Sequence, residues 1–128
     1  MEKLCDAYAT LGSSGFGVLL EPMDGAVRRV DPSANAYPER AADYCLLLAS
    51  LRADAEQNEV HLQQVRDTSM ALEPFCTGRA YVNYLDDDEL ERVPTAYGRE
   101  IYERLRAVKR TYDPTNFFRA NQNIAPAS

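Results

Sequence analysis

The last third of this 128-residue chain carries a helical repeat of apolar and aromatic side chains, followed by a tail without a repeat. The side chains of the repeat recur at steps of four, four, three and four residues: Tyr97, Ile101, Leu105, Val108 and Tyr112. This spacing places them on one face of an α-helix, which turns once in about 3.6 residues. Pro94 and Thr95 predict its start, with Thr95 as N-cap, and Asp113-Pro114 predicts its end. The sequence therefore predicts an amphipathic helix and then an irregular tail.

Short runs rich in strand-forming residues predict an antiparallel sheet. Gly17–Glu21 and Ala26–Val30 flank the sequence Pro22-Met23-Asp24-Gly25, a turn that is typical of a β-hairpin. Asp43–Ser50 contains an apolar run of strand length. Arg79–Leu85 alternates in character, so a strand there would direct its odd-numbered side chains to one face. We predict four strands from these runs.

Helical patterns occupy much of the remaining chain. Lys3–Leu11 predicts a short helix, and a second helix is expected to start at a capping box formed by Asp54 and Gln57 and to end near Pro74. The acidic run Asp86–Glu91 is predicted to be a solvated loop or a short turn, because closely spaced carboxylates repel one another. Together the elements predict an α+β fold, an antiparallel sheet with helices packed on one face.

Composition and charge argue against several functional classes. The formal charge of −6 argues against a nucleic-acid partner, since the basic residues between positions 99 and 110 alternate with glutamates. The longest apolar run, Cys45–Ala49, is too short to span a membrane. The first residues do not have the pattern of a secretory signal. We therefore expect a soluble and cytoplasmic protein with neither a nucleic-acid nor a membrane partner.

The sequence does not predict a metal site. The cysteines Cys5, Cys45 and Cys76 are odd in number and lack the paired spacing of zinc ligands. His61 is the single histidine and has no second ligand at a suitable spacing. The acids of Asp86–Glu91 lack the glycine-centred spacing of a calcium loop. Free or buried thiols and a solvated acidic segment are the expected outcome.

Tyr81 and Asn83 would project together from one face of the predicted strand. From that pattern alone an ordinary solvated strand is the favoured interpretation. Two further motifs follow it: Tyr112-Asp113-Pro114-Thr115-Asn116-Phe117-Phe118 and Asn121-Gln122-Asn123-Ile124. With Tyr81-Val82-Asn83, this combination resembles the C-terminal segment of the berberine bridge enzyme-like oxidases, FAD-linked oxidoreductases of the vanillyl-alcohol oxidase superfamily. The resemblance extends upstream through Asn35–Arg40 and covers roughly residues 15–124.

The resemblance implies a division of the chain. Residues 1–78 would be the C-terminal part of the substrate-binding domain and residues 79–128 the C-terminal segment of the family, together forming one folded unit. The cofactor implied is FAD, bound mainly by an FAD-binding domain on the same or another chain. That domain would also supply the histidine and cysteine of the covalent flavin linkage, which His61 does not match. The chain alone is not expected to bind FAD tightly, because it supplies few of the contacts that the cofactor needs.

The resemblance also implies roles for particular side chains. Tyr81 would be the catalytic base that takes the hydroxyl proton of the substrate. A phenol has an unperturbed pKa of about 10, so its anion must be stabilised by neighbours or by the cofactor. Asn83 would orient Tyr81 or bind the flavin edge. Asn121 and Gln122 would contact FAD or fix the tail against it, and Asn116 would cap the turn after Pro114.

Three functions are compatible with these patterns. The first is an FAD-dependent oxidoreductase fragment or subunit that oxidises an alcohol, sugar or similar small molecule and is complete only with a separate FAD-binding domain. The second is a non-catalytic remnant or binding module that dimerises through an exposed sheet. The third is a small free-standing enzyme of ferredoxin-like fold, for which the sequence offers no catalytic motif.

Overall fold

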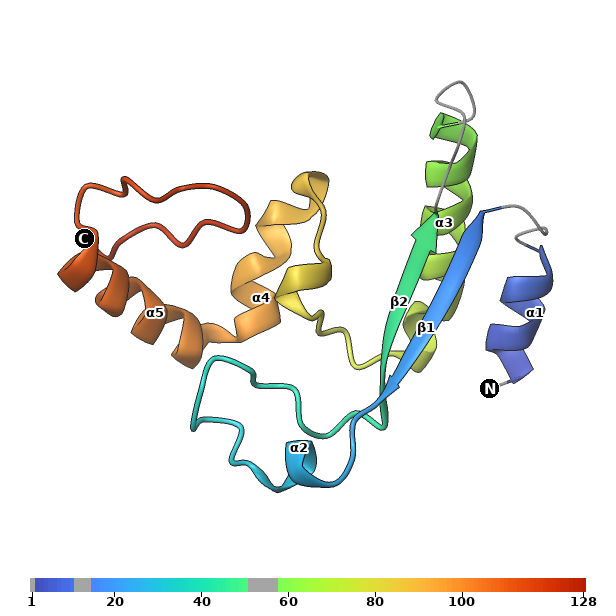
Figure 1. Cartoon of the computed structure of the whole chain (residues 1–128), viewed down its shortest axis with the longest axis horizontal. Coiled ribbons are helices and arrows are strands. Elements are labelled where there is room, and N and C mark those ends of the chain that lie inside the picture. The colour runs from blue at the N-terminus through green and yellow to red at the C-terminus, as the bar shows by residue number, and fades with distance from the viewer. Residues whose placement is uncertain (1, 11–14, 51–57) are drawn as a thin grey trace. The chain divides into compact units, whose positions relative to one another are not determined.

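The computed structural model describes residues 2–10, 15–50 and 58–128 (Figure 1). The chain divides into two compact units. The first comprises residues 1–22 and 43–78, and the second comprises residues 23–42 and 79–128. Each unit is therefore assembled from two separate stretches of the sequence. The predicted division at residue 78 stays a prediction.

The first unit combines a two-stranded antiparallel sheet with helices. Its elements, in chain order, are α1 (Glu2–Thr10), β1 (Phe16–Pro22), β2 (Tyr44–Ser50), α3 (Asn58–Leu72) and a 3-10 turn (Glu73–Phe75). Helix α3 lies beside β2 and also contacts α1 (Figure 1). The α+β class is confirmed.

Strands β1 and β2 pair directly, with Phe16 opposite Ser50 and Pro22 opposite Tyr44. The strands predicted at residues 17–21 and 43–50 are confirmed, but the hairpin is wrong because β1 pairs with β2 across a long connection. Residues 26–30 were predicted as a strand, whereas Ala26–Arg29 form the short helix α2. The guanidinium of Arg28 donates to the carbonyls of Ala41 and Ala42, each at 3.2 Å. These polar contacts hold the segment in a local turn, where strand preference alone is a weak constraint.

Helix α3 contacts both strands of the first unit through His61. The ring of His61 stacks on Phe16, with 5.1 Å between the ring centroids, and its Nδ1 lies 3.2 Å from Ser50 Oγ. Thr68 is buried and donates its hydroxyl to the carbonyl of Gln64 at 2.8 Å. Leu72, the last residue of α3, is also buried. The predicted capping box at residues 54–57 lies outside the described residues.

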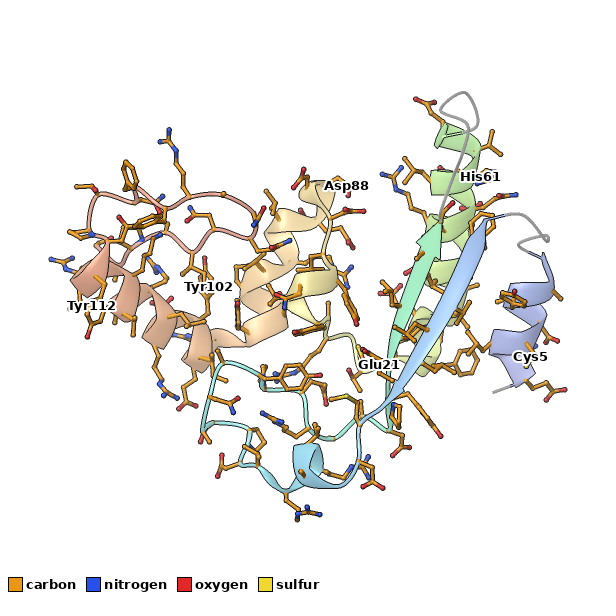
Figure 2. All side chains as sticks on the ribbon, in the orientation of Figure 1. Cys5, Glu21, His61, Asp88, Tyr102 and Tyr112 are labelled. Carbon is orange, nitrogen blue, oxygen red and sulfur yellow. The ribbon has the colours of Figure 1, made fainter. Side chains whose placement is uncertain are left out.

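The second unit is predominantly helical. After α2 it contains a 3-10 turn (Val82–Tyr84), a second 3-10 segment (Asp87–Arg92), α4 (Val93–Tyr97) and α5 (Arg99–Tyr112). Its core is a cluster of Leu85, Val93 and Ala96, with exposed fractions of 6%, 2% and 4%. Tyr102 of α5, labelled in Figure 2, packs against this cluster.

Residues 79–85 do not form the predicted strand. A 3-10 turn replaces it, in which the Tyr84 N–H donates to the Tyr81 carbonyl at 2.8 Å. The turn is favoured because Leu85 can then enter the buried cluster. Of the four predicted strands, the structure contains two within the described residues.

The start of the predicted C-terminal helix differs from the prediction. Thr95 was predicted as an N-cap but lies inside α4. Gly98, with φ of 75°, separates α4 from α5, so the helical repeat is broken at its first member. The acidic run forms a short 3-10 turn, one of the two predicted forms, and its start is a capping box between Asp86 and Glu89.

The tail after α5 folds back along the helix, as the red loop in Figure 1 shows. The Ala127 N–H donates to the Arg106 carbonyl at 3.2 Å, and the Arg110 side chain donates to the Ala127 carbonyl at 3.0 Å. Lys109 donates to the Phe118 carbonyl. These contacts fix an irregular segment that has no hydrogen-bond ladder of its own. None of the helices in the described ranges combines the length and the apolar character needed to cross a membrane.

Candidate functional site

The polar pair predicted from the Tyr-x-Asn sequence is present in the second unit. The side-chain amide of Asn83 donates to the phenolic oxygen of Tyr81 at 2.7 Å. A strand would also have placed the two side chains on one face, but here the 3-10 turn brings them together. Tyr81 is half-buried and Asn83 is exposed. The pair is therefore a phenol with a hydrogen-bond donor fixed at its oxygen.

Other tyrosines surround the ring of Tyr81. Tyr84 lies edge-on to it, with 4.9 Å between ring centroids and an interplanar angle of 79°. Tyr37 also lies edge-on, at 5.4 Å and 71°. Such edge contacts are favourable because the positive edge of one ring faces the negative face of the other. Tyr81 therefore sits in an aromatic cluster drawn from both stretches of the second unit.

Tyr97, at the end of α4, belongs to the same neighbourhood. Burial raises the pKa of Tyr97, and the neighbouring Tyr81 raises it further. The second effect requires the two phenols to be close enough to interact electrostatically. Tyr97 also packs against the buried cluster that contains Leu85. The aromatic cluster is thus continuous with the apolar core of the second unit.

A charged contact borders the tyrosines. Arg79 lies 3.8 Å from Glu39. Glu39 also accepts the backbone N–H groups of Ala41 and Ala42 at 3.1 and 3.2 Å. These contacts connect the segment before Tyr81 to the segment that carries Tyr37.

Gln122 ties the tail to the core. Its side-chain amide donates to the Leu85 carbonyl at 2.8 Å. Asn121 is exposed, has φ of 55°, and its carbonyl accepts the Asn123 N–H at 2.8 Å. Asparagine is one of the few non-glycine residues that adopt this left-handed conformation readily. The structure therefore gives Gln122 and Asn121 places in the tail, while their predicted contacts with FAD stay predictions.

Two asparagine side chains of the tail have unmet hydrogen-bonding capacity. The side-chain oxygens of Asn116 and Asn123 are buried and have no hydrogen-bond partner among the described residues. Asn116 closes the turn after Pro114 through its backbone, since its N–H donates to the Asp113 carbonyl at 3.0 Å. Its side-chain oxygen accepts no hydrogen bond from a described residue, so that oxygen does not make the predicted cap.

Asp113 organises the tail, a role that the sequence analysis missed. The sequence analysis used it only as a helix stop, whereas its carboxylate accepts the N–H groups of Phe117 and Phe118 at 2.7 and 3.0 Å. It also pairs with Lys109 at 2.6 Å. An aspartate directly after a helix and before Pro114 is typical of side-chain acceptors for nearby backbone amides, and this signal could have identified it.

The cysteines Cys5, Cys45 and Cys76 are free thiols, as the sequence predicts. Burial raises the pKa of Cys45, and the charge of Glu21 adds to the effect. In residues 2–10, 15–50 and 58–128 there is no cluster of three or more histidine, cysteine, aspartate or glutamate side chains that could hold a metal ion.

Comparison with known proteins shows which proteins the chain is similar to. The family model for berberine and berberine-like proteins matches residues 80–125. Berberine bridge enzyme-like 17 of Arabidopsis thaliana is 30% identical over 144 aligned positions, covering 100% of this chain and 27% of the relative. Residues 80–125 therefore match the berberine and berberine-like family, and the chain as a whole is similar to berberine bridge enzyme-like proteins. An FAD-linked oxidoreductase of Bacillus subtilis is 37% identical over 110 positions, which cover 83% of the chain and 23% of the relative.

A solved structure of a berberine bridge enzyme-like protein has the same fold. A variant of the berberine bridge enzyme-like 1 protein of Physcomitrella patens aligns with a TM-score of 0.78 at 23% identity, over 99% of this chain and 27% of that protein. The chain therefore spans about a quarter of the length of the family members that it matches. All four predicted site residues, Tyr81, Asn83, Asn121 and Gln122, lie within the segment that the family model matches.

Proposed function

We propose that this chain supplies the catalytic tyrosine of a berberine bridge enzyme-like FAD-dependent oxidoreductase. The reaction is the oxidation of an alcohol, sugar or similar small molecule. The observation that carries the proposal is the 2.7 Å hydrogen bond from the Asn83 amide to the phenolic oxygen of Tyr81. The activity is complete only when a separate FAD-binding domain, on the same or another chain, is present.

In the proposed reaction Tyr81 acts as the general base. The proton of the substrate hydroxyl passes to the phenolate oxygen of Tyr81, a carbon–oxygen double bond forms, and a hydride leaves the substrate carbon. FAD, when bound, is the hydride acceptor. The Asn83 amide donates to the oxygen that alternately carries negative charge and a proton, and hydrogen bonds to a charged acceptor are stronger than neutral ones. Asn83 therefore both orients the phenol and stabilises its charged form.

The side chains present suit the polar edge of a flavin ring. That edge needs both hydrogen-bond donors and acceptors, and the exposed amides of Asn83 and Asn121 offer both types. Gln122 is committed to the Leu85 carbonyl, so we assign it the role of holding the tail in place. The FAD-binding domain would bind the remainder of the cofactor.

A flavin titration tests this proposal directly. The chain is titrated with FAD alone and then mixed with a protein that carries an FAD-binding domain of the family, and visible absorbance and flavin fluorescence are recorded. Binding only in the mixture supports the proposal. Tight binding to the chain alone contradicts the need for a partner domain, and absence of binding in both cases favours a module without catalysis.

One observation favours that second function, a dimerising module. The two-stranded sheet leaves Leu19 of β1 and Tyr44 of β2 exposed, at 48% and 51%. Exposed apolar side chains on a short sheet favour association with another protein surface. Sedimentation of the chain separates the two functions: a stable dimer that excludes the FAD-domain partner supports the module, and a monomer that binds the partner supports the oxidoreductase.

A further inference from the structure

The segment Asn35–Arg40 contacts the proposed catalytic tyrosine from a distant part of the sequence. Tyr37 lies edge-on to Tyr81 with ring centroids 5.4 Å apart. Tyr84, the other edge-on neighbour, belongs to the same turn as Tyr81 and moves with it. Tyr37 lies outside that turn, so its contact can restrain the orientation of the Tyr81 ring relative to the rest of the unit.

Tyr37 is itself held by Arg40. The guanidinium carbon of Arg40 lies 4.8 Å from the centroid of the Tyr37 ring, which is a cation–π distance. Its Nε donates to the Tyr37 carbonyl at 3.1 Å, and its two Nη atoms donate to the Val27 carbonyl at 3.1 Å and to Asn35 Oδ1 at 3.0 Å. Because the guanidinium is planar and rigid, these donors fix it in one orientation.

Further contacts tie down both ends of Tyr37. The Asn35 side-chain oxygen that binds Arg40 also accepts the Tyr37 N–H at 3.0 Å. At the other end, the Tyr37 hydroxyl donates to the sulfur of Met23 at 3.7 Å, and Met23 is buried. The ring of Tyr37 is thus restrained by its backbone, by its hydroxyl and by the Arg40 cation.

We propose that Tyr37 is a positioning residue, locked by Arg40, that holds the Tyr81 ring where the Asn83 amide reaches its oxygen; its catalytic consequence rests on the proposed function. Asn83 is exposed and contributes one hydrogen bond, which by itself does not fix the side-chain torsions of the phenol ring. The edge contact from Tyr37 removes that freedom. Small misplacements of a reacting group are costly in catalysis, so the ring orientation matters to the rate.

Fluorine NMR of the chain labelled with fluorotyrosine tests the positioning without any turnover. The Tyr81 resonance is the signal that disappears in Tyr81→Phe. We expect this resonance to shift toward that of free fluorotyrosine in Tyr37→Leu and in Arg40→Met, and to stay in place in Tyr37→Phe, which keeps the ring. Tyr112→Leu is the matched control, because Tyr112 is 83% exposed at the end of α5 (Figure 2). A Tyr81 resonance that is unmoved in both Tyr37→Leu and Arg40→Met overturns the proposal.

Kinetics in the mixture with the FAD-domain partner then test the consequence. We expect Tyr37→Leu to lower kcat on the order of tenfold with KM unchanged, as misorientation of a reacting group does, and Tyr37→Phe to retain kcat. A change confined to KM overturns the positioning role. If the resonance shifts while Tyr81→Phe turns over normally, Tyr37 still positions Tyr81, but the assignment of Tyr81 as base fails.

Discussion

Lys109 and Asp113 form an ion pair across the end of α5, with 2.6 Å between Nζ and Oδ2. The same carboxylate accepts the backbone N–H groups of Phe117 and Phe118. Only 9% of Asp113 is exposed. One acidic side chain therefore joins the helix to the first residues of the tail, and the tail in turn reaches the core where Gln122 binds the Leu85 carbonyl.

This arrangement makes the stability of the chain depend on pH. The hydrogen bond from Lys109 lowers the pKa of Asp113 below its ordinary value of 3.8; burial opposes the shift, and the N–H groups of Phe117 and Phe118 add to it. Because the folded form holds the carboxylate in its charged state, the stabilisation is present above pH 3.8 and is lost as the pH falls through the lowered folded pKa. We expect Asp113→Asn to be less stable near neutral pH and to lose less stability on acidification.

Thermal unfolding followed by circular dichroism over a pH series measures this effect. Asp24→Asn is the matched control, since Asp24 is exposed in the structure. Equal acid sensitivity of Asp113→Asn and the unsubstituted chain would contradict the role of Asp113.

Gly98 separates α4 from α5 at a backbone conformation that other residues adopt with strain. Its φ is 75°, and a Cβ placed there would lie 3.3 Å from Nη1 of Arg79. We expect Gly98→Ala to destabilise the chain by about 1 kcal/mol or more, since alanine is unfavourable at positive φ. Gly25→Ala is the matched control, because Gly25 has φ of 64° with nothing within 4 Å of the added Cβ. In urea unfolding, a larger loss at Gly98 than at Gly25 isolates the cost of the Arg79 contact, and equal losses leave backbone strain as the whole effect.

Leu85 is the buried residue that directly follows the 3-10 turn found in place of the predicted strand. With 6% of its surface exposed, it packs with Val93 and Ala96. We expect Leu85→Ala to lower the free energy of unfolding by about 2–5 kcal/mol, through lost burial and the cavity that remains. Leu90, which is 43% exposed, is the control, and its substitution by alanine should cost much less. Similar losses at both positions in urea unfolding would show that the cluster is not the stabilising core.

The sequence predicted the elements whose signals are local. The period of α5 and the proline after it placed the body and the end of that helix but not its start, and β1 and β2 lie where their apolar runs predict. The errors at residues 26–30 and 79–85 share one physical cause. A strand needs a neighbour for its backbone groups, whereas contacts distant in sequence, such as Arg28 with the Ala41 carbonyl, favour turns there.

The proximity of Tyr81 and Asn83 was predictable from the sequence, but the surroundings of the pair were not. The spacing of Tyr81 and Asn83 placed the two side chains together, and the structure joins them by a hydrogen bond. The edge contact of Tyr37 could not be inferred, because it depends on how the connection between β1 and β2 packs within the second unit. Patterns in a sequence report which residues share a face, whereas tertiary packing decides what covers them.

The role of Tyr81 is tested by removing its oxygen while keeping its ring. In the mixture with an FAD-domain partner, we expect Tyr81→Phe to lower the rate of flavin reduction by about 10²–10⁴-fold, the usual contribution of a general base. Folding should persist, because phenylalanine retains the edge contacts with Tyr37 and Tyr84 that the ring of Tyr81 makes. Tyr84→Phe is the matched control, since it removes a hydroxyl from the neighbouring ring of the same turn and should leave the rate within a few-fold of the unsubstituted chain. Equal rates for Tyr81→Phe and Tyr84→Phe, with both variants folded by circular dichroism, would exclude Tyr81 as the base.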